Sequence, residues 1–200
     1  MLMKSTSAPQ LVSGEPVSLA SLHQGASGTI ARVLEDDGAV LRLELPYTKL
    51  PAAAMFRRGV ALWIVVESNE AMDMSALAAL PNAPAHLLSP PAEMSPGVTA
   101  IRLETPPSML VSAEASGQSW VISIGPQVPS IPAQVQLIRE IAASASKLRA
   151  LMSGATQIAW LNDPQIGDRI AVVLANAPSR GLADGQEFVE FTALPSMQGL

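Results

Sequence analysis

Two glutamates at the ends of matching motifs are the first candidates for acid–base chemistry. Glu44 and Glu104 close the sequences Leu-Arg-Leu-Glu and Ile-Arg-Leu-Glu, respectively. Glycoside cleavage uses such a pair of carboxylates, one of which has a raised pKa inside a cleft. Arg42 and Arg102 would share the solvent-facing side of the same strands, where cross-strand charge pairs are the simpler interpretation. We therefore expect no catalytic residue and no enzyme activity.

Metal and cofactor chemistry has equally little support in the sequence. Asp163 and Asp168, five residues apart in the stretch NDPQIGD, could bind Ca²⁺, but the D-x-[DN]-x-[DN]-G pattern is missing. We expect instead that Asp163 hydrogen-bonds within its own turn and that Gly167 supplies a positive φ angle. His23 and His86 have no second His at metal-binding spacing, and the chain contains no Cys, Walker loop, G-x-G-x-x-G, G-x-S-x-G or H-E-x-x-H motif. We predict no metal site and no cofactor.

Three tryptophans are the candidates for a binding surface. Trp63, Trp120 and Trp160 could form an aromatic platform for a sugar or for a protein partner. The repeated placement of glycine before tryptophan in β-branched segments favours packing of these tryptophans, Trp160 included, in the core. The platform interpretation predicts at least one exposed Trp, or an exposed Tyr47, beside polar groups. The sequence does not identify a binding residue.

The composition limits the classes of partner. A net charge of −5 and a pI of about 5.0 argue against binding to the phosphate backbone of nucleic acids. Arg57-Arg58 is the one local basic spot, and we expect both side chains to stay in water. Hydrophobic residues make up 48% of the chain, so we expect a dense core or a surface that a partner covers. The uncharged stretch Met74–Ala92 contains four prolines, so we predict no transmembrane segment.

Hydrophobic patterning predicts a mostly-β chain. Residues 41–45 alternate Leu with Arg and Glu, as in a strand with one buried side. Turn signals at 37–38, 57–59 and 184–185 separate strands of this kind. We predict an all-β fold of antiparallel β-sandwich-like units, with one short helix near residues 73–80.

Residues 41–66 and 101–124 resemble each other. Both start with Arg-Leu-Glu, turn at a proline, and reach a glycine and then a tryptophan, so that Gly59 matches Gly117 and Trp63 matches Trp120. This likeness predicts two copies of a strand–hairpin–strand unit about sixty residues apart. Independent β patterning is the alternative, because alternating strands resemble one another.

The segment 132–152 supports two interpretations. Read locally it is a helix, with Pro132 in the first turn, Gly154 as a stop, and one apolar face made of Ile138, Ile141, Ala145, Leu148 and Met152. Its residues from Val135 to Ile141 also alternate, and the following ASAS could be a turn between two strands. From the residues alone, helix and strand pair both remain open, with helix favoured locally.

Several stretches together resemble one family. FRRGVALWIVVE, MDMSALAAL, SGQSWVISI and LNDPQIGDRIAVV, with the closing EFVEFTALPSMQGL, are similar to the β-rich N-terminal region of uncharacterised tetratricopeptide-repeat proteins of bacterial envelopes. The likeness covers roughly residues 40–200, and its most specific part is the D-P-x-x-G-D turn with LP-x-x-QG. The order of elements is more loosely similar to AMIN-type modules, which attach envelope proteins to peptidoglycan or to pore partners. The resemblance implies strands within 133–161 and a periplasmic or envelope-associated location.

These observations lead to one expected organisation. Residues 1–27 form a flexible tail or arm, 28–126 a first β-rich unit, and 127–200 a second unit cut from a longer protein. We expect a non-catalytic protein–protein interaction or structural module of a larger envelope protein. Its partners would be other envelope proteins or further copies of itself. The alternative is a peptidoglycan- or carbohydrate-binding module.

Overall fold

The computed structural model describes residues 29–36, 39–141 and 146–200. Strands account for 57% of the structure and helix for 2%, which confirms the all-β prediction. The tail or arm expected at residues 1–27 and the turn expected at 37–38 lie outside the described residues.

The short helix predicted near residues 73–80 is confirmed as α1 (Ser75–Ala78). The amide of Ser75 donates to Asp73 Oδ1 at 2.8 Å, so an aspartate turn leads into the helix. Within the three described ranges, no helix is long and apolar enough to cross a membrane.

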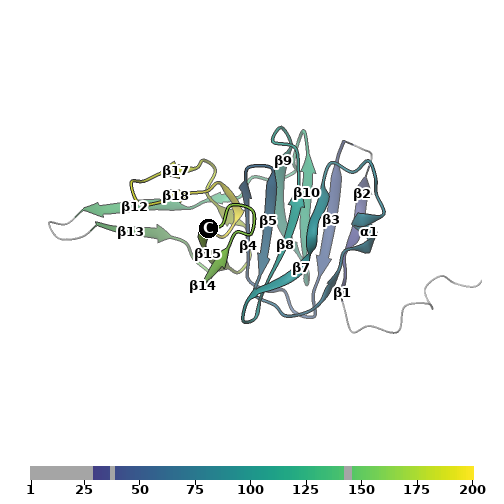
Figure 1. Ribbon diagram of the computed structural model, residues 1–200, viewed down its shortest axis with the longest axis horizontal. Coiled ribbons are helices and arrows are strands. Elements are labelled where there is room, and N and C mark those ends of the chain that lie inside the picture. Colours follow the sequence, from purple (N-terminus) through teal and green to yellow (C-terminus); the bar gives the residue numbers. More distant parts are fainter. Residues whose placement is uncertain (1–28, 37–38, 142–145) are drawn as a thin grey trace, which may run out of the picture.

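Two antiparallel sheets pack face to face and form a sandwich (Figure 1). The first has the order β2-β3-β10-β9, with β2 (Arg32–Asp36), β3 (Leu41–Pro46), β10 (Ser119–Gly125) and β9 (Leu110–Ser116). The second contains the order β4-β5-β8-β7, with β4 (Ala53–Arg58), β5 (Ala61–Val66), β8 (Val98–Glu104) and β7 (His86–Ser95). A short parallel pair, β1 (Thr29–Ile30) with β6 (Met72–Asp73), lies at one end.

The sandwich has an internal two-fold pattern of strand pairing. Residues 58 and 61 pair across the β4–β5 turn, and residues 116 and 119 pair across the β9–β10 turn, 58 positions later in each case. The pair 61↔104 joins β5 to β8, and the pair 119↔46 joins β10 to β3. These two pairs are also related by 58 positions, since residue 119 follows residue 61 by 58 and residue 46 precedes residue 104 by 58. The first half of the sandwich (β2 to β5) and the second half (β7 to β10) therefore each contribute two strands to each sheet.

This shift keeps the predicted glycine correspondence and changes the others, because the two Arg-Leu-Glu motifs lie 60 residues apart. Gly59 and Gly117 are equivalent and have φ angles of +58° and +60° in their hairpin turns. The predicted match of Trp63 with Trp120 is wrong, because the shift of 58 brings Trp120 onto Leu62 instead. Side chains alternate along a strand, so a displacement by one residue turns a side chain to the opposite face of its sheet.

Two hydrophobic cores lie on the two faces of the second sheet. The sandwich core contains Leu41, Leu43 and Leu45 of β3 and alternate residues of β5, as the predicted alternation requires. The outer core contains the remaining β5 side chains, including Trp63, packed against Leu161 and Leu174. All six residues of β5 are buried, so this strand has no solvent-facing side.

C-terminal strands extend the second sheet beyond the sandwich. The strands β14 (Ala155–Asn162) and β15 (Arg169–Ala175) form a hairpin, and β15 joins β4 through the pair Ala175↔Ala53. The last strand, β19 (Ser196–Gln198), also pairs with β4. Strands from both sides of residue 127 therefore share one sheet, while the predicted division into two units stays a prediction.

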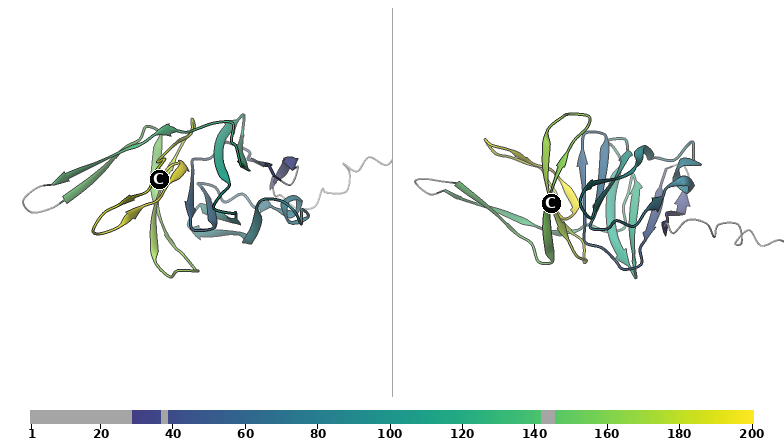
Figure 2. Two further views of the ribbon diagram at one scale, coloured as in Figure 1. Left: turned by 90° about the horizontal axis from the view of Figure 1, so that it is seen from above. Right: turned by 60° about the horizontal axis from the view of Figure 1, so that its bottom comes forward.

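The contested segment is a pair of strands. The strands β12 (Gln136–Ile141) and β13 (Ser146–Leu151) pair with each other, so the helical interpretation of 132–152 is wrong. The parallel pair of β11 (Ala133–Gln134) with β16 (Arg180–Gly181) fixes the preceding backbone in an extended form. A further small hairpin consists of β17 (Gln186–Glu187) and β18 (Thr192–Ala193). Figure 2 shows the C-terminal hairpins gathered on one side of the sandwich.

Candidate functional site

The two candidate glutamates lie on different sheets. Glu44 on β3 accepts a hydrogen bond from Ser119 Oγ at 2.7 Å and pairs with Arg32 across the neighbouring strand at 3.5 Å. Glu104 ends β8 in the other sheet and is exposed. The geometry therefore matches a cross-strand charge pair for Glu44 and does not join the two carboxylates in one sheet.

The matching arginines differ in a similar way. Arg42 pairs with Glu114 at 3.5 Å on the outer side of the first sheet. Arg102 instead lies over the Trp63 ring, with its guanidinium carbon 5.3 Å from the ring centroid, and donates to Ser89 Oγ at 2.9 Å. It belongs to the lining of the outer core rather than to a surface ion pair.

The turn that contains Asp163 and Asp168 is closed by an arginine from β4. Asp163 Oδ1 accepts from the amide of Gln165 at 2.8 Å, and Gly167 has a φ angle of +83°, as the sequence predicted. Arg58 Nη1 donates to Asp163 Oδ2 and to Asp168 Oδ1, at 2.7 Å each, and Arg58 Nη2 donates to Asp168 Oδ2. A cation of this chain thus bridges the two carboxylates that could have bound calcium.

This ion cluster corrects the expectation that Arg57 and Arg58 stay in water. The Arg58 side chain is 17% exposed, and its hydrogen bonds lower the pKa of Asp168 below its usual value. Arg57 donates to the carbonyl oxygens of Pro106 and Met109 at 3.2 and 2.6 Å, and burial lowers its pKa. Both guanidinium groups connect segments that are distant in the sequence, Arg57 through backbone carbonyls and Arg58 through carboxylates.

The tryptophans divide into two buried side chains and one exposed side chain. Trp63 and Trp120 are 1% and 0% exposed, and Trp120 Nε1 donates to the carbonyl of Pro51 at 3.0 Å. Tyr47 is also buried. Trp160 is 55% exposed, which corrects the prediction of core packing for this residue. Its neighbourhood is therefore the candidate binding surface.

Trp160 lies on the outer face of the β14–β15 hairpin, which we call the ribbon. Ala159 and Leu161 on β14 point into the outer core together with Val172 and Leu174 of β15. The alternate residues, Ile158 and Trp160 on β14 and Ala171 and Val173 on β15, lie on the opposite face. The ribbon is therefore apolar on both faces, and the outer core covers one of them.

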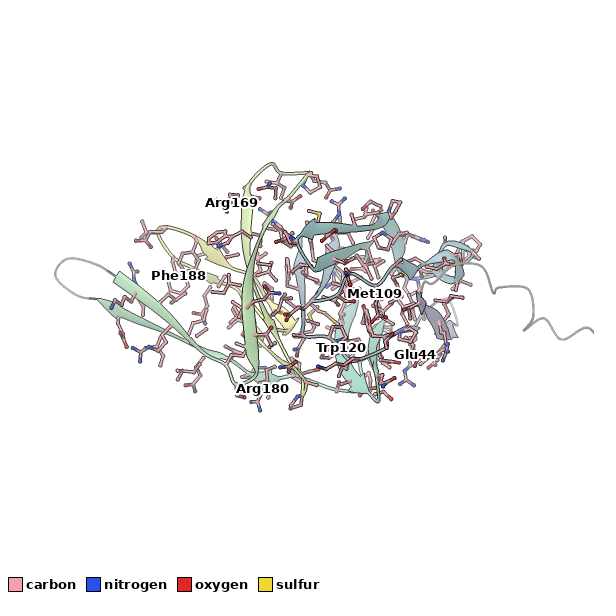
Figure 3. All side chains as sticks on the ribbon, turned by 90° about the horizontal axis from the view of Figure 1, so that it is seen from below. Glu44, Met109, Trp120, Arg169, Arg180 and Phe188 are labelled. Carbon is pink, nitrogen blue, oxygen red and sulfur yellow. The ribbon has the colours of Figure 1, made fainter. Side chains whose placement is uncertain are left out.

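The outer face of the ribbon is the floor of an open groove of about 970 Å³. One wall consists of Leu137, Leu148 and Ala150 from the β12–β13 hairpin. The other wall consists of residues 190–194, which include Phe191 and both residues of β18. Figure 3 shows Arg169 on the ribbon and Phe188 on the neighbouring hairpin, on the side of the molecule away from Glu44.

The charges around the groove are mostly paired. Arg149 lies 3.1 Å from Glu140, Arg139 lies 3.7 Å from Glu190, and Arg58 holds Asp168. Arg169 is different, because its guanidinium carbon lies 4.7 Å from the centroid of the Trp160 ring and it forms no ion pair with the described residues. The groove thus offers apolar surface and one arginine without an ion pair among the described residues, which suits an apolar ligand that carries a carboxylate.

No group of three or more His, Asp and Glu side chains that could hold a metal ion occurs among the residues that the structure describes. His86 is exposed at the start of β7, and His23 lies outside the described ranges. The sequence did contain one signal for the groove. The runs IAWL and IAVVLA are nearly continuous in apolar residues, which is typical of strands covered on both faces.

Fold and groove together define an all-β protein in which a sandwich carries an open apolar groove on its C-terminal side. No protein-family model matches the chain, and no curated protein or solved structure matches it either. The resemblance to the N-terminal region of tetratricopeptide-repeat envelope proteins therefore stays a prediction.

Proposed function

We propose that this chain is a non-catalytic interaction module that binds a protein partner in the groove. The observation that carries the proposal is the outer face of the ribbon, where Ile158 and Trp160 are 59% and 55% exposed beside other apolar groove residues. Contiguous exposed apolar surface of this kind marks interaction sites. Exposed tryptophans surrounded by apolar contacts are also frequent centres of binding energy at protein interfaces.

The cellular setting of the proposal comes from the sequence resemblance alone. It assigns the module to a larger periplasmic or envelope-associated protein, whose partners would be other envelope proteins or further copies of the same chain. The β12–β13 hairpin supports an interaction role, because a two-stranded hairpin without a core of its own is marginally stable in water. Packing against a partner would stabilise it.

Selection from a phage-displayed library of random peptides tests whether the groove binds polypeptide. We expect enrichment of apolar peptides that contain Asp or Glu, and we expect Trp160→Ala to weaken their binding by about 30-fold. Leu110→Ser is the matched control, because Leu110 is 52% exposed on β9 and does not line the groove. Peptides that bind the Trp160→Ala variant as well as they bind the wild type would contradict the proposal.

One observation favours a carbohydrate-binding module as the second candidate function. Trp160 is exposed beside the polar Arg169, as an aromatic platform for a sugar ring requires. Acrylamide quenching of tryptophan fluorescence, with and without peptidoglycan fragments, separates the candidates. We expect one quenchable tryptophan, absent in Trp160→Phe, that the fragments leave unprotected. Protection by the fragments would favour the carbohydrate module instead.

A further inference from the structure

Both faces of the ribbon are apolar, but only the inner face is covered by the rest of this chain. Its inner face is sealed by the outer core, in which Leu161 and Leu174 are 0% exposed. On its outer face the groove is open, and Ile158 and Trp160 remain in contact with water. Removing large apolar side chains from water is favourable, so an occupant that covers this face gains binding free energy.

The groove sets two chemical requirements for its occupant. The occupant must supply apolar side chains for the floor around Trp160. It should also supply a carboxylate, because Arg169 is a cation on this floor that has no ion pair among the described residues. The Arg169 guanidinium carbon lies 4.7 Å from the Trp160 ring centroid, and the N–H groups of a guanidinium pair with planar anions such as carboxylates.

The chain itself presents a segment that meets both requirements. Val189, between β17 and β18, is 89% exposed, the highest value among the exposed large hydrophobic residues of the described chain. It is flanked by Glu187 and Glu190 and by Phe188 and Phe191, whose rings stack with centroids 4.8 Å apart. We call residues 187–191 the tip.

The tip cannot fill the groove of its own chain. Phe191 and Glu190 already stand in the groove wall, and Val189 is not part of the groove lining. Glu190 faces Arg139, whereas Glu187 is exposed and forms no ion pair with the described residues. One apolar side chain and one carboxylate of the tip are therefore available to another molecule.

We propose that the groove is occupied by the tip of a second copy of this chain, so that two copies form a symmetric dimer. In this dimer Val189 of each copy packs on Trp160 of the other, and Glu187 pairs with Arg169. This inference rests on the proposed function of the groove as a protein-binding surface. Because groove and tip border the same face of the molecule, one two-fold axis can satisfy both contacts at once and close the assembly.

Sedimentation velocity across a concentration series tests the dimer with the full chain. We expect a reversible monomer–dimer equilibrium in the wild type. Trp160→Ala and Val189→Asp should each weaken dimerisation by about 30-fold, and Arg169→Glu and Glu187→Arg by at least about tenfold. The controls are Leu110→Ser and Lys49→Glu, because both residues are exposed away from the groove and the second control makes the same charge change as Arg169→Glu.

A charge exchange tests the pairing itself. Arg169→Glu and Glu187→Arg should each associate poorly alone, because both contacts then join like charges. An equimolar mixture should regain a heterodimer, because both contacts then join opposite charges, one as in the wild type and one reversed. A chain that stays monomeric at every concentration, or a dimer as sensitive to the two control substitutions as to the groove substitutions, overturns the inference. If the chain is monomeric but still selects peptides through Trp160, the proposed function survives and the groove belongs to a different protein.

Discussion

At the scale of single residues, Tyr47 is a buried phenol without a hydrogen-bond partner. Its side chain lies in the sandwich core at 5% exposure, and its Oη atom forms no hydrogen bond with the described residues. Burial raises its pKa above the ordinary value of 10.0, and the nearby negative charge of Glu70 adds to the effect. The folded protein therefore favours the neutral phenol.

The predicted consequence is that Tyr47→Phe stabilises the protein. Removing a buried hydroxyl that lacks a partner should raise the free energy of unfolding by about 1 kcal/mol at neutral pH. Because the folded-state pKa is raised, the stability that depends on the neutral phenol is complete below pH 10 and is lost as the pH rises further. Urea denaturation at neutral and alkaline pH should show a steeper alkaline loss in the wild type than in the variant.

The chain contains a single tyrosine, so phenolate absorbance gives an independent measurement. In the folded wild type, the rise in absorbance should follow alkaline unfolding rather than precede it. Ionisation near pH 10 in a protein that is still folded would contradict the assigned burial of Tyr47.

Single-residue roles were predictable where they depend on local contacts. The turn of Asp163 and the positive φ of Gly167 arise within six residues of sequence, and both were predicted correctly. The partner of Asp163, Arg58, lies 105 positions away in the chain, so no local pattern could reveal it. For the same reason Trp160 could not be distinguished from Trp63, since exposure depends on which distant elements pack against each strand.

At the scale of elements, the two equivalent hairpin turns allow an internal comparison. Gly59 and Gly117 have φ angles of +58° and +60°, and a Cβ atom at either position would meet no other atom within 4 Å. The cost of an alanine there is therefore backbone strain alone. We expect Gly59→Ala and Gly117→Ala each to lower the free energy of unfolding by about 1–2 kcal/mol.

Urea denaturation of the two variants measures these costs. Asparagine at either position should cost less than alanine, because Asn tolerates the left-handed region better. Equal costs at the two positions are expected from the shared geometry of the turns. A cost at one position and none at the other would show that the turns are not equivalent.

The β12–β13 hairpin shows why local sequence patterns can mislead. Ile138, Ile141 and Leu148 have helical spacing, and the segment reads locally as a good helix. In the structure, Val135 is buried and its amide donates to the carbonyl of Gly181 at 2.8 Å, which holds the chain extended as it enters β12. This contact spans 46 positions, and such tertiary contacts override helix propensity.

At the scale of the whole molecule, the sequence predicted the fold class and a repeated strand–hairpin–strand pattern, but not how the strands combine. The alternation of β3 was read correctly because one of its sides faces the sandwich core. By contrast, β5 is buried throughout, so its sequence contains no alternation that could place Trp63 on one face or the other. The pairing of β5 with β8 and of β10 with β3 joins the halves through contacts that no local motif encodes.

The second sheet is shared by both cores, and this predicts a single cooperative unfolding transition. Trp63 reports on the outer core and Trp120 on the sandwich core. Opening the outer core alone would expose Trp63, Phe56 and Leu174, at about 1.5–3 kcal/mol for each large side chain. That sum approaches the total stability of a typical domain, about 5–15 kcal/mol, so partial opening has little advantage over complete unfolding.

Fluorine NMR of protein labelled with 5-fluorotryptophan can follow both cores in the same molecule, with signals assigned by single Trp→Phe variants. In a urea titration, we expect the native signals of Trp63 and Trp120 to disappear with one midpoint. In the Val189→Asp background, which removes the proposed dimer contact, the signal of Trp160, which is 55% exposed in the single chain, should shift least on unfolding and serves as the internal control. A lower midpoint for Trp63 than for Trp120 would mean that the strands after residue 127 unfold separately. The predicted division of the chain would then describe two independent units instead of one molecule built around a common sheet.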